Sequence, residues 1–529
     1  MGIQDFWKHV EKAGQPTSLT NLAIEEGFKV DRRNTSTILV GIDTSLWYSQ
    51  CQTEFQHPGL HAQRRENPEL RALFYRLAAL LRLPITPVFV FDGGKRPPYK
   101  RWKTAKYRPI WYSGHFEKMI RAFGFHCHTA PGDAEAELAL LNQKGFIDAV
   151  LTEDNNAFLF GARFVIRVAA RNYTTAVNAH DGGLDAVEVY SAQNILSKAL
   201  LSQAGMLLVA VLRGGDYDEI GLRGCGSEVA FALARAPLAK SLHDAAISMS
   251  LPQLRRFLEL WRSDLFKELS VDLHGYLGRE YHALAHAIPP DFPDPETVQL
   301  YAKPSTSWSG SSVEPQIPVW SPQLPDLPTL AALCETYFSW GHEICTRLSA
   351  QIWTGYCTRQ LIWLRKSPPH PEHPFRLENI IRINKSKLQR TAASPYKSYR
   401  LEMNLVSSLN TAVSGLGSTH PAPRGISTGW LVTMWIPATI VERIVDHLVP
   451  EEMQQQDRVL TTWVTLLDPP ILAPVPISLG TFDLTLADDE EDIPTTDFDA
   501  NTEMPGLRSV IDLTAADSAG VEVIDLTSM

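Results

Sequence analysis

The sequence is poor in cysteine, has no long apolar run and carries no excess of positive charge. Its six cysteines lie far apart without a Cys-x-x-Cys pair, which is typical of a reduced intracellular protein rather than of a disulfide framework. No apolar stretch reaches the ~20 residues that a membrane-spanning helix needs, so we expect no membrane partner. The N-terminus has no basic segment followed by an apolar one, which argues against a secretory signal.

The formal net charge of −10 argues against general affinity for nucleic acid, although a total charge can hide a local basic surface. The length of 529 residues predicts two or three domains with tails, because single cores rarely grow beyond about 300 residues. Hydrophobic residues make up 44% of the chain, which is enough to build such cores.

Continuous apolar runs indicate the fold class of the first part of the chain. Thr37–Asp43 and Pro87–Asp92 have the length of buried strands, and each ends in an aspartate. Between them we expect a helix over Glu69–Leu83, and further on a strand over Phe146–Thr152. Apolar strands that alternate with helices favour an α/β fold with a parallel sheet covered on both faces.

Carboxylates recur where these strands end. Asp43, Asp92 and Asp154 stand at or after strand ends, and Asp133 and Glu135 stand where a loop enters a helix. Ligands of open α/β sheets bind outside the carboxyl ends of the strands, so we expect these acids in one crevice. Carboxylate oxygens are the ligands that Mg²⁺ prefers. For each acid alone an ordinary surface carboxylate is the competing interpretation, and the repetition favours a metal site.

Two further stretches are typical of contact with DNA. Lys95–Trp111 is basic and aromatic and contains no acid, as suits phosphates and unpaired bases; a solvated basic loop or a nuclear-import patch is the alternative. Gly214–Asp216 and then Gly221–Gly226 precede an expected helix. Such glycines allow a tight turn whose amides can approach phosphate. Asp216 adds a possible metal ligand.

Together these stretches resemble the XPG-type structure-specific endonucleases, which include the flap endonucleases, and most of all the fungal branch of the Holliday-junction resolvases. The resemblance covers roughly residues 1–270. Its motifs are Met1-Gly2-Ile3 with Trp7, Gly41–Trp47, Phe89–Gly93 with Arg96-Pro97 and Lys100, Pro131–Ala139, Asp148–Asp154 with Leu159–Ala162, and Gly214–Tyr217 with Gly221–Gly226.

The resemblance implies a PIN-like sheet, a helix-two-turn-helix that grips duplex DNA and holds K⁺, and a site for two Mg²⁺ ions, which Mn²⁺ can replace. The implied catalytic residues are the metal-binding acids and Lys100. The implied metal ligands are Asp43, Asp92, Asp133, Glu135, Asp154, Asn156 and Asp216. The implied DNA-binding residues are Gly2, Lys100, Arg101, Lys103, Lys106, Arg108, Gly221, Gly224 and Gly226.

The chain departs from the family pattern at two ligand positions. Asp133 stands where the family has glutamate, and Asn156 stands where it has aspartate. The expected function is a Mg²⁺-dependent endonuclease that cuts branched DNA (5′ flaps, forks, four-way junctions) in repair and recombination, with dimerisation on four-way junctions left open. The alternative, motivated by Asn156, is a branched-DNA-binding protein with an attenuated or inactive nuclease site.

The sequence predicts five regions. They are an N-terminal nuclease region with a basic arch (1–115), an internal nuclease region with the helix-two-turn-helix (116–285), a Pro-rich connector with helices (286–375), a chromodomain-like module (376–450) and a disordered acidic tail (451–529).

The tail repeats a short apolar motif, as Val510-Ile511-Asp512-Leu513 and Val523-Ile524-Asp525-Leu526. Both copies resemble SUMO-interacting motifs, which add a strand to the edge of a partner's sheet. We therefore expect SUMO or SUMO-modified repair proteins as partners and a nuclear location; a chance apolar pair is the alternative. The implied contact residues are Val510, Ile511, Leu513, Val523, Ile524 and Leu526.

Overall fold

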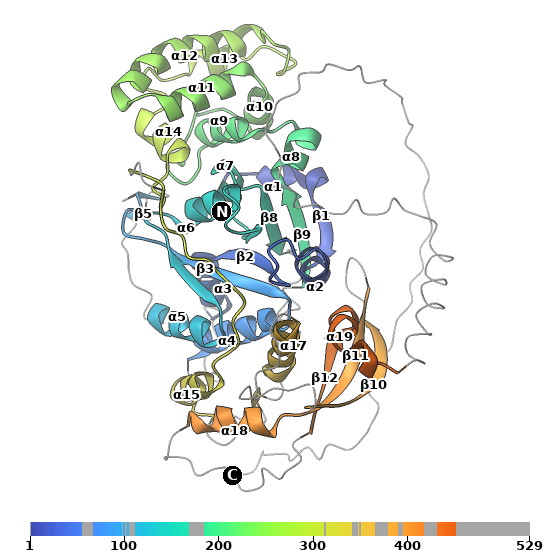
Figure 1. Cartoon of the computed structure of the whole chain (residues 1–529). Coiled ribbons are helices and arrows are strands. Elements are labelled where there is room, and N and C mark those ends of the chain that lie inside the picture. The colour runs from blue at the N-terminus through green and yellow to red at the C-terminus, as the bar shows by residue number, and fades with distance from the viewer. Residues whose placement is uncertain are drawn as a thin grey trace, which may run out of the picture. The chain divides into compact units, whose positions relative to one another are not determined.

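A mixed sheet organises the first part of the chain (Figure 1). Its strands are β1 (Gln15–Ser18), β2 (Ile38–Asp43), β3 (Ile85–Phe91), β6 (His126–Thr129), β7 (Ala149–Leu151), β8 (Phe164–Val168) and β9 (Ala186–Ser191), in the order β1-β9-β8-β7-β2-β3-β6. The computed structural model describes residues 2–55, 67–97, 99–100, 103–104, 112–168, 185–310, 314–340, 347–348, 351–365, 379–389, 395–416 and 431–450, all within one compact unit, Met1–Leu479.

The central strands confirm the predicted parallel sheet. β2 pairs in parallel with β3 and β7, β3 with β6, and β7 with β8. All six residues of β2 are buried. Successive side chains of a strand point to opposite faces, and accordingly Val40 and Ile42 belong to one apolar core while Leu39 belongs to the other. Both faces are therefore covered.

One edge of the sheet is antiparallel. β9 runs antiparallel to β8, and β1 runs antiparallel to β9. The residues of β1, Gln-Pro-Thr-Ser, show no apolar alternation, so the sequence alone does not indicate this strand. The strand after α6 (Ala134–Gln143) is also shorter than predicted, since the Phe146 amide donates to the Leu141 carbonyl (2.8 Å) and stays in a turn.

Helices pack on both faces of the sheet (Figure 1). One core receives residues of α4 (Pro68–Leu81), α5 (Ser113–Ala122), α15 (Leu327–Phe338) and α17 (Trp353–Leu364). The other receives residues of α6, α7 (Asn156–Leu159) and α9 (Gln203–Arg213). The remaining elements here are α1 (Phe6–His9), η1 (Glu11–Ala13), α2 (Leu19–Leu22), η2 (Ala23–Lys29), α3 (Thr44–Phe55) and the hairpin β4 (Tyr99–Lys100) with β5 (Lys103–Thr104).

A helical lobe follows the sheet and lies at the top of Figure 1. It comprises α8 (Ala192–Ala199), α9, α10 (Ser227–Leu233), α11 (Pro237–Ser248), α12 (Leu251–Val271), α13 (His282–His286) and α14 (Pro295–Ala302). Within the described residues no single helix is long and apolar enough to span a membrane, although α8 and α9, bent by 73°, together meet the length and composition criterion.

The Pro-rich connector lies against the nuclease fold. The Ser307 amide donates to the buried Glu137 carboxylate (2.8 Å), and His126 Nε2 is 2.7 Å from the Ser321 carbonyl. The Asp326 amide donates to the Ala122 carbonyl (2.8 Å), at the end of α5. Sequence reasoning missed these contacts, because Pro- and Ser-rich composition alone is typical of a free linker.

A second sheet lies in the region predicted as a chromodomain-like module. β10 (Ile380–Gln389), β11 (Tyr396–Asn404) and β12 (Leu431–Pro437) are antiparallel and are followed by α19 (Ala438–Val445) and η8 (Asp446–Leu448). α18 (Val406–Ser414) lies between β11 and β12 in the chain. Arg443 Nη1 donates to the Phe28 carbonyl (3.0 Å), which joins α19 to the nuclease region. The likeness to a chromodomain stays a prediction.

Gly41 allows α6 to approach the centre of β2. A Cβ atom on Gly41 would lie 2.4 Å from Leu138 Cδ2 and 2.5 Å from Ile147 Cδ1. We predict that Gly41→Ala lowers the free energy of unfolding by about 1–3 kcal/mol through overpacking, measured by thermal unfolding followed by circular dichroism. Gly114→Ala is the control, because a Cβ atom on Gly114 meets nothing within 4 Å. Equal melting temperatures for both variants would contradict this account.

Candidate metal centre and DNA-binding surfaces

Three buried carboxylates converge at the carboxyl ends of the central strands. They belong to Glu135 in the first turn of α6, Asp154 in the loop after β7 and Asp216 in the loop after α9. One oxygen from each lies within 4.8 Å of the others. Their residues are only 6%, 1% and 1% exposed. An all-oxygen donor set of this kind fits Mg²⁺ or Mn²⁺.

Backbone geometry fixes the acid that follows β7. The Asp154 amide donates to Thr152 Oγ1 (3.0 Å), and Asp154 Oδ1 accepts the Asn156 amide (3.0 Å). The Asn156 side-chain amide donates to Asp216 Oδ2 (3.1 Å). Asn156 thus lies beside the cluster, at the position predicted for it, and its carbonyl oxygen could serve as a neutral ligand.

Asp43 ends β2 and is 1% exposed. Its Oδ1 accepts the Ser45 amide (2.8 Å), and its Oδ2 accepts the Ser45 hydroxyl (2.9 Å). Asp43 is not one of the three converging acids.

Glu153, beside Asp154, is also not one of them, and its Oε1 lies 3.5 Å from Gln50 Nε2. Burial raises the pKa of Glu153, and the charge of Arg167 opposes that shift.

Arg96 bridges two other predicted ligands, Asp92 and Asp133. Its Nη1 is 2.9 Å from Asp92 Oδ2, and its Nε donates to Asp133 Oδ1 (2.9 Å). The Tyr217 hydroxyl donates to Asp133 Oδ2 (2.8 Å). Burial alone would lower the pKa of Arg96, but the charges of Asp92 and Asp133 raise it above its ordinary value.

Sequence reasoning did not predict that Arg96 or Tyr217 would contact the acids. Arg96 lies in the basic stretch, but nothing local marked it as the partner of the acids. Tyr217 follows the ligand Asp216 directly, and that adjacency was the one available signal.

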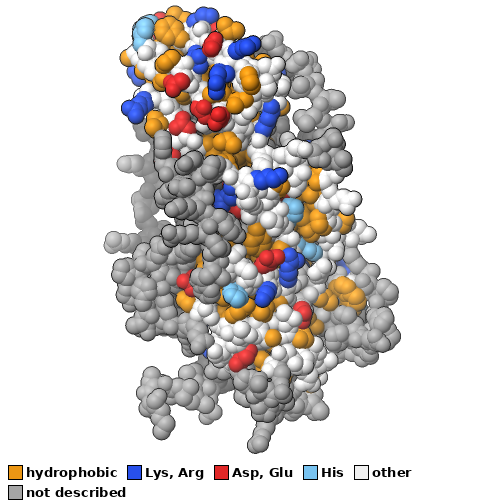
Figure 2. Space-filling view, turned by 90° about the vertical axis from the view of Figure 1, so that its left-hand side faces the viewer, with side chains coloured by type: hydrophobic (Ala, Val, Ile, Leu, Met, Phe, Trp, Pro, Cys, Tyr) orange, Lys and Arg blue, Asp and Glu red, His pale blue; other side chains and the backbone are white. Residues whose placement is uncertain are grey.

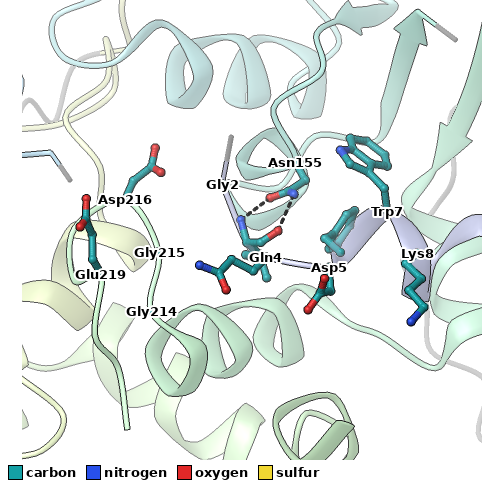
Figure 3. A pocket seen from close by; sticks show the side chains of 12 residues that line it. Gly2, Gln4, Asp5, Trp7, Lys8, Asn155, Gly214, Gly215, Asp216 and Glu219 are labelled. Carbon is teal, nitrogen blue, oxygen red and sulfur yellow. Dashed lines mark hydrogen bonds between the residues drawn. The ribbon is translucent and has the colours of Figure 1, made fainter. Parts of the chain in front are cut away.

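The N-terminal segment lines one side of the crevice (Figure 3). Gly2 has φ +81°, and a Cβ atom there would lie 2.6 Å from Asp154 Oδ1. The Ile3 backbone amide donates to Asn155 Oδ1 (2.7 Å), and the Asn155 side-chain Nδ2 donates to the Ile3 carbonyl (2.9 Å). Asn155 thereby anchors the N-terminus beside Asp154, one of the three converging acids. A cavity of about 550 Å³ lies here, between residues 2–8 and the loop at Gly214–Asp216.

The glycine turn in the helical lobe has the predicted backbone. Gly221 has φ +59° and Gly224 φ +87°, and a Cβ atom on Gly221 would lie 2.5 Å from the Gly214 amide nitrogen. Gly226 precedes the first residue of α10.

A second cavity, of about 450 Å³, lies next to this turn and is lined by Arg223, Gly224, Arg279 and Tyr281 among others. On the face seen in Figure 2, Lys and Arg side chains of this lobe lie among acidic and apolar ones.

Several predicted residues cannot be placed in these surfaces. Lys100 and Lys103 contribute backbone to the β4–β5 hairpin, and their side chains lie outside the described part of the structure. Arg101, Lys106 and Arg108 lie outside the described residues, as do both copies of the apolar tail motif.

Comparisons with known proteins agree with this geometry. The model of the XPG N-terminal domain matches residues 1–110, and that of the XPG I-region matches residues 124–216. Flap endonuclease GEN homolog 1 of Mus musculus is 32% identical over 263 residues, covering 46% of this chain and 26% of the mouse protein. Flap endonuclease 1 of Aeropyrum pernix is 25% identical, covering 39% of this chain and 70% of the archaeal protein. The chain thus matches only about a quarter of the length of the mouse relative.

Solved structures match over a longer range. The eukaryotic junction-resolving enzyme GEN-1 with caesium aligns with a TM-score of 0.64 and 26% identity, covering 86% of this chain and 100% of that one. The Holliday junction-resolving enzyme GEN1 with product DNA and Mg²⁺ aligns with a TM-score of 0.63 and 25% identity over the same shares. These matches show that the first part of this chain contains an XPG N-terminal domain, over residues 1–110, and an XPG I-region, over residues 124–216.

Proposed function

We propose that the protein is a Mg²⁺-dependent, structure-specific endonuclease that cuts branched DNA. The observation that carries the proposal is the convergence of Glu135, Asp154 and Asp216 within 4.8 Å, at the carboxyl ends of a sheet built like those of XPG nucleases. The solved GEN1 complex with product DNA and Mg²⁺ supports the same reaction here. Four-way junctions and 5′ flaps are the proposed substrates.

The chain's own groups would hold the reactants. Glu135, Asp154 and Asp216 would bind divalent ions, with Asn156 as a neutral neighbour. Bound ions of this kind supply an activated water and stabilise charge on the leaving oxygen. Gly2 lets the N-terminal segment pack closely on residues 154–156, because a Cβ atom there would lie 2.6 Å from Asp154 Oδ1 and 2.9 Å from Asn156 Oδ1. The glycine turn at Gly221–Gly226 would hold the phosphates of a duplex through its amides.

The alternative function, a branched-DNA binder with a weakened nuclease site, is favoured by one observation. The Asn156 side-chain Nδ2 donates to Asp216 Oδ2 (3.1 Å), so one predicted ligand position holds a neutral group that already bonds a neighbouring predicted ligand. An ion bound here would lose the attraction of one negative charge.

Other parts of the proposal rest on residues or partners that the structure does not describe. We propose K⁺ at the glycine turn, since GEN-1 has been solved with potassium. We further propose DNA contacts by Lys100 and its basic neighbours, dimerisation on four-way junctions, SUMO recognition by the tail motifs and a nuclear location. Solved human GEN1 in complex with Holliday junction DNA shares the fold of this chain.

We predict that the wild-type protein cleaves labelled 5′-flap and four-way-junction DNA in Mg²⁺, and that Glu135→Gln reduces the rate by at least about a thousandfold, since a metal ligand loses its charge. Binding of the same substrates in Ca²⁺ should be retained or tightened, because the variant removes negative charge that faces phosphate. Single-turnover cleavage and fluorescence anisotropy provide the two measurements.

Glu153→Gln is the matched control, because Glu153 is a neighbouring, partly buried acid that is not one of the three converging carboxylates. It should cleave at a rate close to wild type. If folded wild-type protein cuts no branched substrate, the enzymatic proposal is wrong.

We predict that Asn156→Asp separates the two functions. If the natural site is an adequate nuclease, the variant should change the single-turnover rate by less than about tenfold while lowering the Mg²⁺ concentration needed, since a charged ligand binds Mg²⁺ more tightly. A variant that turns on cutting by orders of magnitude, with unchanged DNA affinity, would identify the natural protein as a binder.

A further inference from the structure

Arg96 is inserted between two acids that the family resemblance assigns to metal binding. Its guanidinium reaches Asp92 Oδ2 and Asp133 Oδ1, each at 2.9 Å. The other oxygens of these acids also accept bonds, Asp92 Oδ1 from the Ala134 amide (2.9 Å) and Asp133 Oδ2 from the Tyr217 hydroxyl (2.8 Å). All four carboxylate oxygens therefore already have a donor.

The backbone holds Arg96 in this position. The Gly93 amide donates to the Gly132 carbonyl (2.8 Å), and the Lys95 amide donates to the Pro131 carbonyl (2.8 Å). These two bonds join the turn after β3 to the loop before α6, directly next to Asp92 and Asp133. Arg96 is thus preorganised for the bridge, and a planar, forked guanidinium suits two carboxylates better than an ammonium does.

Burial strengthens the ion pairs that Arg96 makes with Asp92 and Asp133. The side chains of Asp133, Asp92 and Arg96 are 4%, 18% and 29% exposed. A charge pair at this depth is screened less than a surface pair, and removing its cation leaves buried negative charge uncompensated. A divalent ion would need the same oxygens that Arg96 and Tyr217 occupy.

We propose that Arg96 is a positioning residue that competes with a divalent ion for Asp92 and Asp133. It holds the two acids in place before the ion arrives and lowers the affinity of the ion on that side of the crevice. The inference rests on the proposed function for its meaning in catalysis, but the competition itself is a property of metal binding and needs no DNA.

The test is a titration of the metal-free full-length protein with Mn²⁺, with free Mn²⁺ followed by electron paramagnetic resonance. Arg96→Gln should lower the dissociation constant of the weaker-binding Mn²⁺ ion, the one that uses Asp92 and Asp133, by about tenfold. This is the smaller end of the coupling measured for close charge pairs. Arg96→Lys should give an intermediate value, because an ammonium lacks the fork. Lys95→Gln is the matched control: it removes a cation one residue away whose ammonium makes no ion pair with a described residue, and it should bind Mn²⁺ like wild type.

Thermal unfolding supplies a second readout. Without metal, Arg96→Gln should melt below wild type, because Asp92 and Asp133 lose their countercharge. Saturating Mg²⁺ should raise its melting temperature by more than it raises that of wild type, since tighter binding to the folded state stabilises it more. A merely structural role for Arg96 would lower the melting temperature without increasing the gain from Mg²⁺.

The inference is wrong if Arg96→Gln leaves Mn²⁺ affinity unchanged or weakens it, if Lys95→Gln has the same effect, or if no protein variant binds Mn²⁺. Should Arg96→Gln fail to fold, Arg96→Lys decides the question, because it must still bind the weaker ion more tightly than wild type. If Arg96 competes with Mn²⁺ but the protein cleaves no branched DNA, the proposed function is wrong while this inference still holds.

Discussion

Mutual repulsion of buried carboxylates is the constraint on which the site depends. Glu135, Asp154 and Asp216 lie within 4.8 Å of one another, and Asp133 is also buried, only 4% exposed. Like charges this close disfavour one another's ionised forms, and burial adds to the penalty. Hydrogen-bond donors directed at individual carboxylate oxygens offset this repulsion. Backbone amides reach Asp92 and Asp154, and Arg96 supplies a full positive charge.

Much of this arrangement can be predicted from the sequence alone, because it depends on local patterns of apolar and acidic residues. Apolar runs that end in Asp43 and near Asp92 are strands whose direction and burial can be inferred without knowing their partners. Parallel strands all present their carboxyl ends at one edge, so acids at those ends must gather there. The same argument placed Glu135 beside them, since it begins a helix that covers the sheet.

What could not be predicted depends on contacts between distant residues. Three loops are joined by the bridge from Arg96 to Asp133 and by the bond from Tyr217 to the same acid. The hydrophobic periodicity of the sequence does not predict such contacts between distant residues. β1 was missed for a similar reason, because a short polar strand is defined by its pairing with β9. The connector is held by single bonds such as that from Ser307 to Glu137, which composition does not reveal.

The two departures from the family pattern differ in their effect on charge: Asp133 keeps a carboxylate, whereas Asn156 puts a neutral amide where the family has a carboxylate. Asp133 gives one of its oxygens to Arg96 and the other to Tyr217, while Asn156 replaces a carboxylate beside Asp216 with an amide donor. The Arg96 bridge and the Asn156 amide each make the metal-free site easier to fold, because fewer uncompensated charges are buried. Each also removes part of the attraction that a divalent ion would feel. Stability without metal and affinity for metal therefore oppose each other in this crevice, and the identities of residues 96 and 156 set the balance.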